Sequence, residues 1–267
     1  MLSWVRHQMG RAIAHYLDQP SGRYEPFSVQ PTRTLRRFLQ PGDVLLVEGN
    51  KRISTAIKYL TQSTWSHASM YVGDALGTPE DGSEPKTLIE ADLQNGVIGS
   101  PLSIYETFNT RICRPIGLNA VDRRKVVAFM VSKIGLGYDL KNVIDLMRYL
   151  IPTPPVPIRW RRKMMELGSG SPTRAICSTL IAQAFQSVNY PVIPVTRGET
   201  IYAYERGEFT SREVLHGRHH SLFTPRDFDL SPYFQVVKPT IEGGFDHKKL
   251  VWVGDIPADY SPRRQQK

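Results

Sequence analysis

Cys177 and His67 are the residues of this sequence whose types and settings suit nucleophilic chemistry. Cys177 lies where apolar residues begin to recur at helical spacing, which predicts a helix with one buried flank. In the first turn of a helix, the unpaired backbone amides and the helix dipole stabilise a thiolate and a developing oxyanion. Cys177 is therefore a candidate nucleophile, although free cysteines also serve as small buried hydrophobic residues. The apolar positions of this helix are Ile176, Leu180, Ile181, Ala184, Phe185 and Val188.

His67 lies within the segment TWSHASMYVGD, which alternates as a half-buried strand does. This alternation places Trp65, His67, Ser69 and Tyr71 on one face of the strand. A cysteine nucleophile needs a base, and a histidine on a neighbouring strand can supply it. The alternation needs no chemistry to explain it, so a strand-core histidine is the competing interpretation.

The other cysteine and the remaining histidine cluster favour structural roles. Cys113 lies inside the strand candidate TRICRPIG, away from any helix terminus, and is expected in the core. His216, His219 and His220 fall in what reads as an Arg-rich polar loop, which is more typical of a solvated surface than of a metal site. We expect neither a metal nor a cofactor.

The elements that must position Cys177 and His67 are short strands and short helices that alternate along the chain. A Pro-Gly turn leads into a strand at 44–47, a helix follows over 52–63, and Asn95-Gly96 marks a hairpin turn. A helix is expected over 119–135, opened by Asn119 and stopped by Gly135. Near the end of the chain, FTPRDFDLSPYFQVV predicts a capped turn leading to a strand, and KKLVWVGD predicts a final strand. The fold class is α+β: an antiparallel sheet of about five or six strands packed against the Cys177 helix.

In order along the chain, the segments PGDVLL, WSHASMYVG, LIEA, GYD, ICSTLIAQAF and TPRDF resemble the circularly permuted NlpC-type papain-like cysteine hydrolases, in particular the YiiX-like members. The resemblance covers Leu39 to Phe228. It implies that Cys177 is the nucleophile, that His67 is the general base and then acid, and that Glu90 orients the imidazole. Asp92 lies two positions beyond Glu90 on the same strand face and is the alternative to it.

Two further positions fall on the motifs of this family. Tyr138 of GYD is expected to pack the start of a helix rather than to do chemistry. Asp43 is expected to shape the turn before the first strand, although its position in the family leaves a site-lining role open.

The activity implied by the resemblance is acyl transfer from an amide or ester, so that the protein would be a cysteine hydrolase or acyltransferase. The segment 158–165 combines Arg and Lys with Trp and Met, which favours a lipid substrate or an anionic membrane surface over a peptide. A mobile flap would have the same composition. The alternative function is a non-catalytic module of the same fold that binds a membrane surface or another anionic ligand.

Charge and composition limit the partners. The 267 residues carry a net charge of +9, which favours anionic partners, but no nucleic-acid-binding signature is present. In residues 1–17 the apolar side chains recur at helical spacing with basic residues between them, which predicts a basic amphipathic helix. This segment lacks the apolar core of a signal peptide. With only two cysteines, the sequence indicates a reducing compartment. We therefore expect a cytoplasmic protein, peripheral to the inner face of the membrane. The predicted organisation is a helical arm and linker over 1–35, one catalytic domain over 36–255 and a basic tail over 256–267.

Overall fold

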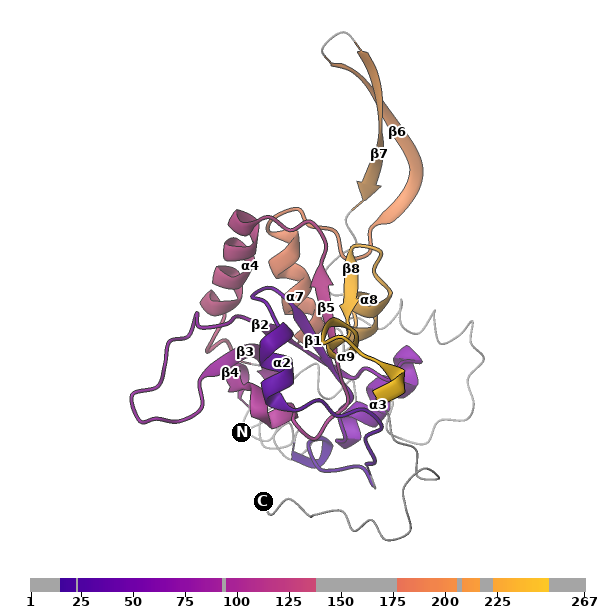
Figure 1. Cartoon of the computed structure of the whole chain (residues 1–267). Helices are drawn as coiled ribbons and strands as arrows, with labels where there is room; N and C mark the ends of the chain where they lie inside the picture. The colour runs from indigo at the N-terminus through magenta and orange to yellow at the C-terminus, as the bar shows by residue number, and fades with distance from the viewer. Residues whose placement is uncertain are drawn as a thin grey trace, which may run out of the picture.

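The computed structural model describes residues 15–22, 24–92, 95–137, 177–205, 208–216 and 223–249. Its centre is a six-stranded antiparallel sheet with the strand order β4-β3-β2-β1-β5-β8 (Figure 1). The predicted α+β class with an antiparallel sheet is confirmed. The strands are β1 (Val44–Val47), β2 (His67–Tyr71), β3 (Lys86–Asp92), β4 (Gly96–Pro101), β5 (Thr110–Pro115) and β8 (Phe234–Val237).

The helices among the described residues are short, and several begin at recognisable signals. Asn119 caps α4 by accepting a hydrogen bond from the Asp122 backbone amide, as its sequence position predicts. A capping box of Thr224 and Asp227 begins α8. The helical segments are α2 (Thr32–Phe38), α3 (Arg52–Thr61), η1 (Leu102–Tyr105), α4 (Ala120–Ser132), α7 (Cys177–Gln186), α8 (Pro225–Leu230), α9 (Pro239–Glu242) and η4 (His247–Lys249).

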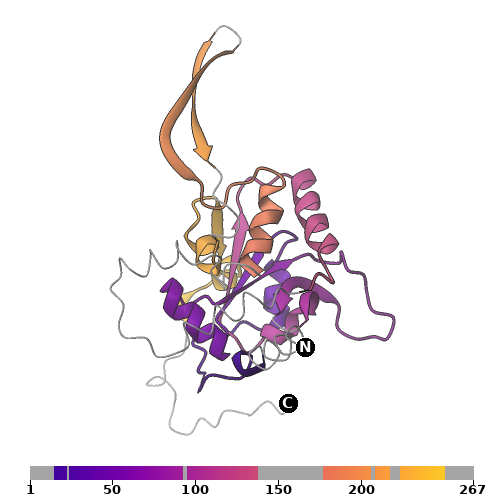
Figure 2. The same ribbon diagram turned by 180° about the vertical axis from the view of Figure 1, so that it is seen from behind.

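Each face of the sheet packs against its own hydrophobic core. On one face, strand residues such as Ala68, Met70 and Ile89 pack with side chains of α4 and α7. On the other face, strand residues such as Tyr71 and Leu88 pack with side chains of α2 and η1. Figure 2 shows α4 and α7 side by side on their face of the sheet. The α7 helix therefore covers one face, and the η1 turn lies on the opposite one.

A second, two-stranded sheet extends away from the six-stranded one (Figure 1). It pairs β6 (Val195–Glu205) with β7 (Glu208–His216) in antiparallel register. The prediction of a polar loop from about residue 196 was wrong, because backbone pairing forms a hairpin despite the many charged residues. His216 ends β7, whereas His219 and His220 lie outside the described residues.

Two further predictions are corrected. Trp65 does not share a face with His67, because β2 begins at His67 and the alternation does not reach back to Trp65. Trp65 instead packs in the core beside α7 and donates from Nε1 to Asp229 at 3.0 Å. The final strand predicted from Lys248 onward begins as the 3₁₀ turn η4, and the rest of that segment lies outside the described residues.

Several predictions fall on residues that the structure does not describe. These are most of the amphipathic segment 1–17, the basic segment 158–165, Tyr138 and the tail 256–267. The expected contact of the two basic segments with an anionic membrane therefore stays a prediction. Within the described ranges, no helix has the length and apolar character that crossing a membrane requires.

Candidate active site

His67 is the first residue of β2, and its ring reaches the next strand of the sheet. The register pairs Met70 with Ile89, so Glu90 and His67 lie diagonally across the two strands on one face. Nε2 of His67 lies 2.5 Å from Oε2 of Glu90. With a proton on Nε2, the ring donates to the carboxylate and leaves Nδ1 for a second partner.

Glu90 is a buried carboxylate with several hydrogen-bond donors. Its oxygen Oε2 also accepts a bond from the Tyr105 hydroxyl, and the side chain of Ser100 is a further partner. Burial alone would raise the pKa of Glu90, but His67, Ser100 and Tyr105 outweigh it and hold the pKa at about 2. Glu90 is therefore ionised at neutral pH. The alternative acid, Asp92, accepts bonds from the backbone and side chain of Asn95.

Cys177 is the first residue of α7 and is buried, with 9% of its surface exposed. Burial opposes ionisation of the thiol, but the charge of His67 and a hydrogen bond to it lower the pKa of Cys177 below the ordinary value. Backbone groups of Ala68 and Ser178 hydrogen bond to the sulfur and act in the same direction. These are the conditions under which a cysteine becomes a thiolate nucleophile.

His67 thus lies between two acidic partners. Burial alone would lower its pKa, whereas Cys177 and then Glu90 raise it to about 10. The imidazolium and the thiolate stabilise one another, and the carboxylate stabilises the imidazolium from its other side. The structure places all three residues predicted from the sequence, Cys177, His67 and Glu90, along one chain of contacts.

These three side chains line a pocket of about 460 Å³. Its wall is mainly apolar, and the apolar side chains come from α3, from strands β1, β3 and β4 and from the region of η1: Ile53, Ile57, Val47, Ala91, Ile98, Ile104 and Phe108. Among the lining residues, the ammonium of Lys51 pairs with the Asp18 carboxylate. The pocket therefore joins the Cys177 thiol to a largely hydrophobic space.

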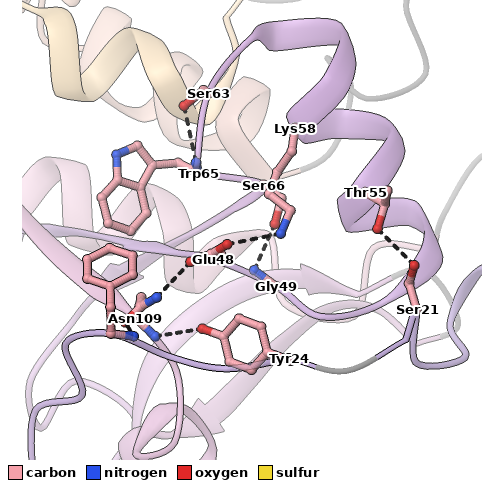
Figure 3. A network of polar contacts seen from close by, with 11 residues as sticks. Ser21, Tyr24, Glu48, Gly49, Thr55, Lys58, Ser63, Trp65, Ser66 and Asn109 are labelled. Atoms are coloured by element: carbon pink, nitrogen blue, oxygen red, sulfur yellow. Dashed lines mark hydrogen bonds and ion pairs between the residues drawn. The ribbon is translucent and has the colours of Figure 1, made fainter.

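A network of polar contacts holds the loop between β1 and α3, which forms part of the pocket wall (Figure 3). Glu48 binds Lys58 at 3.0 Å and the side-chain amide of the buried Asn109 at 2.7 Å. The Gly49 amide donates to Ser66 Oγ at 2.8 Å. A Cβ at Gly49 would lie 2.3 Å from Ser54 Oγ and 3.0 Å from Ser66 Oγ, so any side chain here would force these serines to shift.

Cys113 and Asp43 lie outside the pocket lining. Cys113 is fully buried in the sheet core, and burial raises the pKa of its thiol, as expected of a structural cysteine. Asp43 accepts a bond from the Gln40 amide at 2.8 Å, which closes the predicted turn. It also pairs with Arg114 at 2.8 Å.

Tyr105 and Ser100 are the site residues that the sequence did not indicate. Both contact Glu90, from η1 and β4 respectively. The segment PLSIYETF carries no spacing that marks the tyrosine as part of a polar site. Within the described residues, no group of three or more His, Cys, Asp or Glu side chains is placed to hold a metal ion.

Comparisons with known proteins give a distant structural neighbour. The sequence matches no family model, and a search of curated proteins finds no match. Among solved structures, the chain is similar to one described as the metalloprotein yiiX from Escherichia coli O157:H7, DUF1105. The TM-score is 0.42 and the identity 18%, over 74% of this chain and 96% of the other.

Proposed function

We propose that this protein is a cysteine hydrolase or acyltransferase in which Cys177, His67 and Glu90 act as a triad on a papain-like fold. The observation that carries the proposal is the contact chain from the Cys177 thiol through His67 to Glu90 inside one pocket. A thiol with a lowered pKa, a paired histidine and a third group that orients the ring form the arrangement of nucleophilic catalysis.

The chemistry follows from these positions. The Cys177 thiolate attacks the carbonyl carbon of an amide or ester, and the carbonyl oxygen takes the displaced electron pair. Backbone amides at the start of α7 point to the place of that oxyanion. His67 gives its proton to the leaving amine or alcohol as the tetrahedral intermediate collapses to a thioester. Water or another acceptor, deprotonated by His67, then attacks the thioester, the C–S bond breaks, and the acyl group leaves while the thiolate and the imidazolium are restored.

The pocket favours an acyl group with an apolar portion. Ile53, Ile57 and Ile98 offer it a hydrophobic wall near the thiol. Burying a methylene contributes about 0.8 kcal/mol, which is close to a fourfold gain in kcat/KM for each added CH₂ until the pocket is full. A fatty acyl ester and a peptide with an apolar side chain both satisfy this requirement.

The decisive experiment follows acylation of Cys177 directly. Wild-type protein, Cys177→Ala and His67→Ala are incubated with 4-nitrophenyl esters of increasing chain length, and peptide mass spectrometry locates the adduct. We expect the adduct on Cys177 of the wild type only, with a rate that increases with chain length. If Cys177 is never acylated while binding to anionic vesicles survives both substitutions, the protein is a binding module and the proposal is wrong.

A further inference from the structure

Tyr105 lies where it can control the carboxylate of the candidate triad. It is the last residue of η1, whose Leu102 is fully buried in the core opposite α7. Its ring lies 6.1 Å from the His67 ring and packs edge-on against Phe108 at 6.0 Å. Its hydroxyl donates to Oε2 of Glu90, the same oxygen that contacts His67.

The electrostatics of Tyr105 make it a permanent donor. Burial first, and then the charge of Glu90, raise the pKa of the phenol well above its ordinary value. Glu90 in turn stays ionised, because its pKa is lowered to about 2. A donor and an acceptor that both keep their charge states across the working pH range form a constant hydrogen bond.

The donors to Glu90 come from three different elements. His67 is on β2, Ser100 is on β4 and Tyr105 is on η1. A carboxylate bound by His67 alone could rotate about its side-chain torsions, whereas two further donors fix the plane of the group. Once Oε2 of Glu90 is held in place, its contact with Nε2 fixes the orientation of the His67 ring.

We propose that Tyr105, with Ser100, is a positioning residue that holds Oε2 of Glu90 on Nε2 of His67 and thereby turns the other ring nitrogen toward Cys177. This inference rests on the proposed function and deepens it. Tyr105 acts through Glu90, so its effect must disappear when the carboxylate is absent.

The test measures alkylation of Cys177 by iodoacetamide as a function of pH, with peptide mass spectrometry to separate it from the buried Cys113. Tyr105→Phe keeps the ring and removes the donor. We expect the midpoint of the profile to rise by about one pH unit, a tenfold loss of thiolate below the midpoint. Glu90→Gln should shift it further in the same direction. In the Glu90→Gln background, Tyr105→Phe should have no additional effect.

Two variants support the comparison. Tyr24→Phe removes a hydroxyl that accepts from the Asn109 amide, and its ring lies 5.6 Å from the same Phe108, so its profile should coincide with the wild type. Ser100→Ala removes the other donor to Glu90 and should shift the midpoint as Tyr105→Phe does. It carries the test if Tyr105→Phe does not fold, as judged by circular dichroism.

The outcomes separate the two proposals. If Tyr105→Phe coincides with the wild type, lowers the midpoint, or shifts it equally with and without the Glu90 carboxylate, the positioning role is wrong. If wild-type Cys177 itself titrates as an ordinary thiol and His67→Ala leaves it unchanged, the proposed triad fails first.

Discussion

Glu90→Gln is the substitution that tests the electrostatics of the site most directly. It removes the negative charge beside His67 and keeps the size of the side chain. The pKa of His67 is raised from 6.5 to about 10, which corresponds to about 5 kcal/mol in favour of the protonated ring. Burial opposes this, Cys177 is the larger favourable contribution and Glu90 the smaller one. A hydrogen bond to a charged group contributes about 1.5–3 kcal/mol, so we expect the loss of the Glu90 carboxylate to cost about 2 kcal/mol.

The loss of stability should depend on pH in a defined way. A histidine with a raised pKa in the folded state contributes its full stabilisation below its unfolded value of 6.5 and loses it as the pH rises through about 10. Urea unfolding, followed by tryptophan fluorescence, should show Glu90→Gln less stable than the wild type by about 2 kcal/mol at pH 6. Most of this difference should be lost above pH 10.

Asp92→Asn is the matched control. It removes a carboxylate from the same face of β3 and leaves the bond between His67 and Glu90 in place. Any loss of stability in Asp92→Asn should stay the same from pH 6 to pH 10, in contrast to that of Glu90→Gln. A deficit of Glu90→Gln that stays constant from pH 6 to pH 10 would refute the reasoning, because Glu90 would then contribute through hydrogen bonding alone and not by stabilising a charged ring.

Three further predictions concern the scaffold of the site. Gly49→Ala forces a Cβ against Ser54 Oγ and should destabilise the fold by about 1–3 kcal/mol in thermal unfolding, with slower alkylation of Cys177. Asn109→Ala leaves the buried Asn109 site without its bonds to Glu48 and to the amides of Phe27 and Ser28, and should cost about 2–3 kcal/mol in urea unfolding. Asn119→Ala removes the cap of α4 and should cost about 1 kcal/mol in the same assay, without changing the alkylation profile.

Local sequence signals predicted much of the sheet and its helices. The four apolar residues at 44–47, the Asn95-Gly96 turn and the cap at Asn119 each specify an element through contacts within a few residues. The β6–β7 hairpin was missed because it is stabilised by backbone pairing, and its charged residues conceal the alternation. Trp65 was misplaced because the start of β2 is set by a turn, in which its amide donates to Ser63 Oγ at 3.1 Å.

The three residues of the candidate site were predicted from residue type and order along the chain. The residues that hold them in place, such as Tyr105, were not predicted. Glu90 and Asp92 share a strand face, so strand alternation alone could not choose between them. The register of β2 against β3 does not choose either, because continued from the pair Met70–Ile89 it sets Asp92 directly across from His67 and Glu90 diagonally across. The choice depends on the side-chain contact of 2.5 Å between Nε2 of His67 and Oε2 of Glu90. Tyr105 contacts Glu90 only because η1 folds back over the same face, and such a tertiary contact has no signature in sequence spacing.

The position of His67 at the start of its strand has a geometric reason. His67 pairs with Val47, and paired residues share a face of the sheet. Glu90 lies two residues from Leu88 on β3 and therefore on the same face as Leu88. Because Val47 and Leu88 pack against η1, His67 and Glu90 belong to that face. Cys177 begins the helix that covers the opposite face. Side chains from opposite faces of a sheet are separated by the sheet itself, except where a strand ends. A histidine two residues further along β2, at Ser69, would be enclosed within the sheet, so this arrangement allows the contact with the α7 terminus only from the first position of the strand.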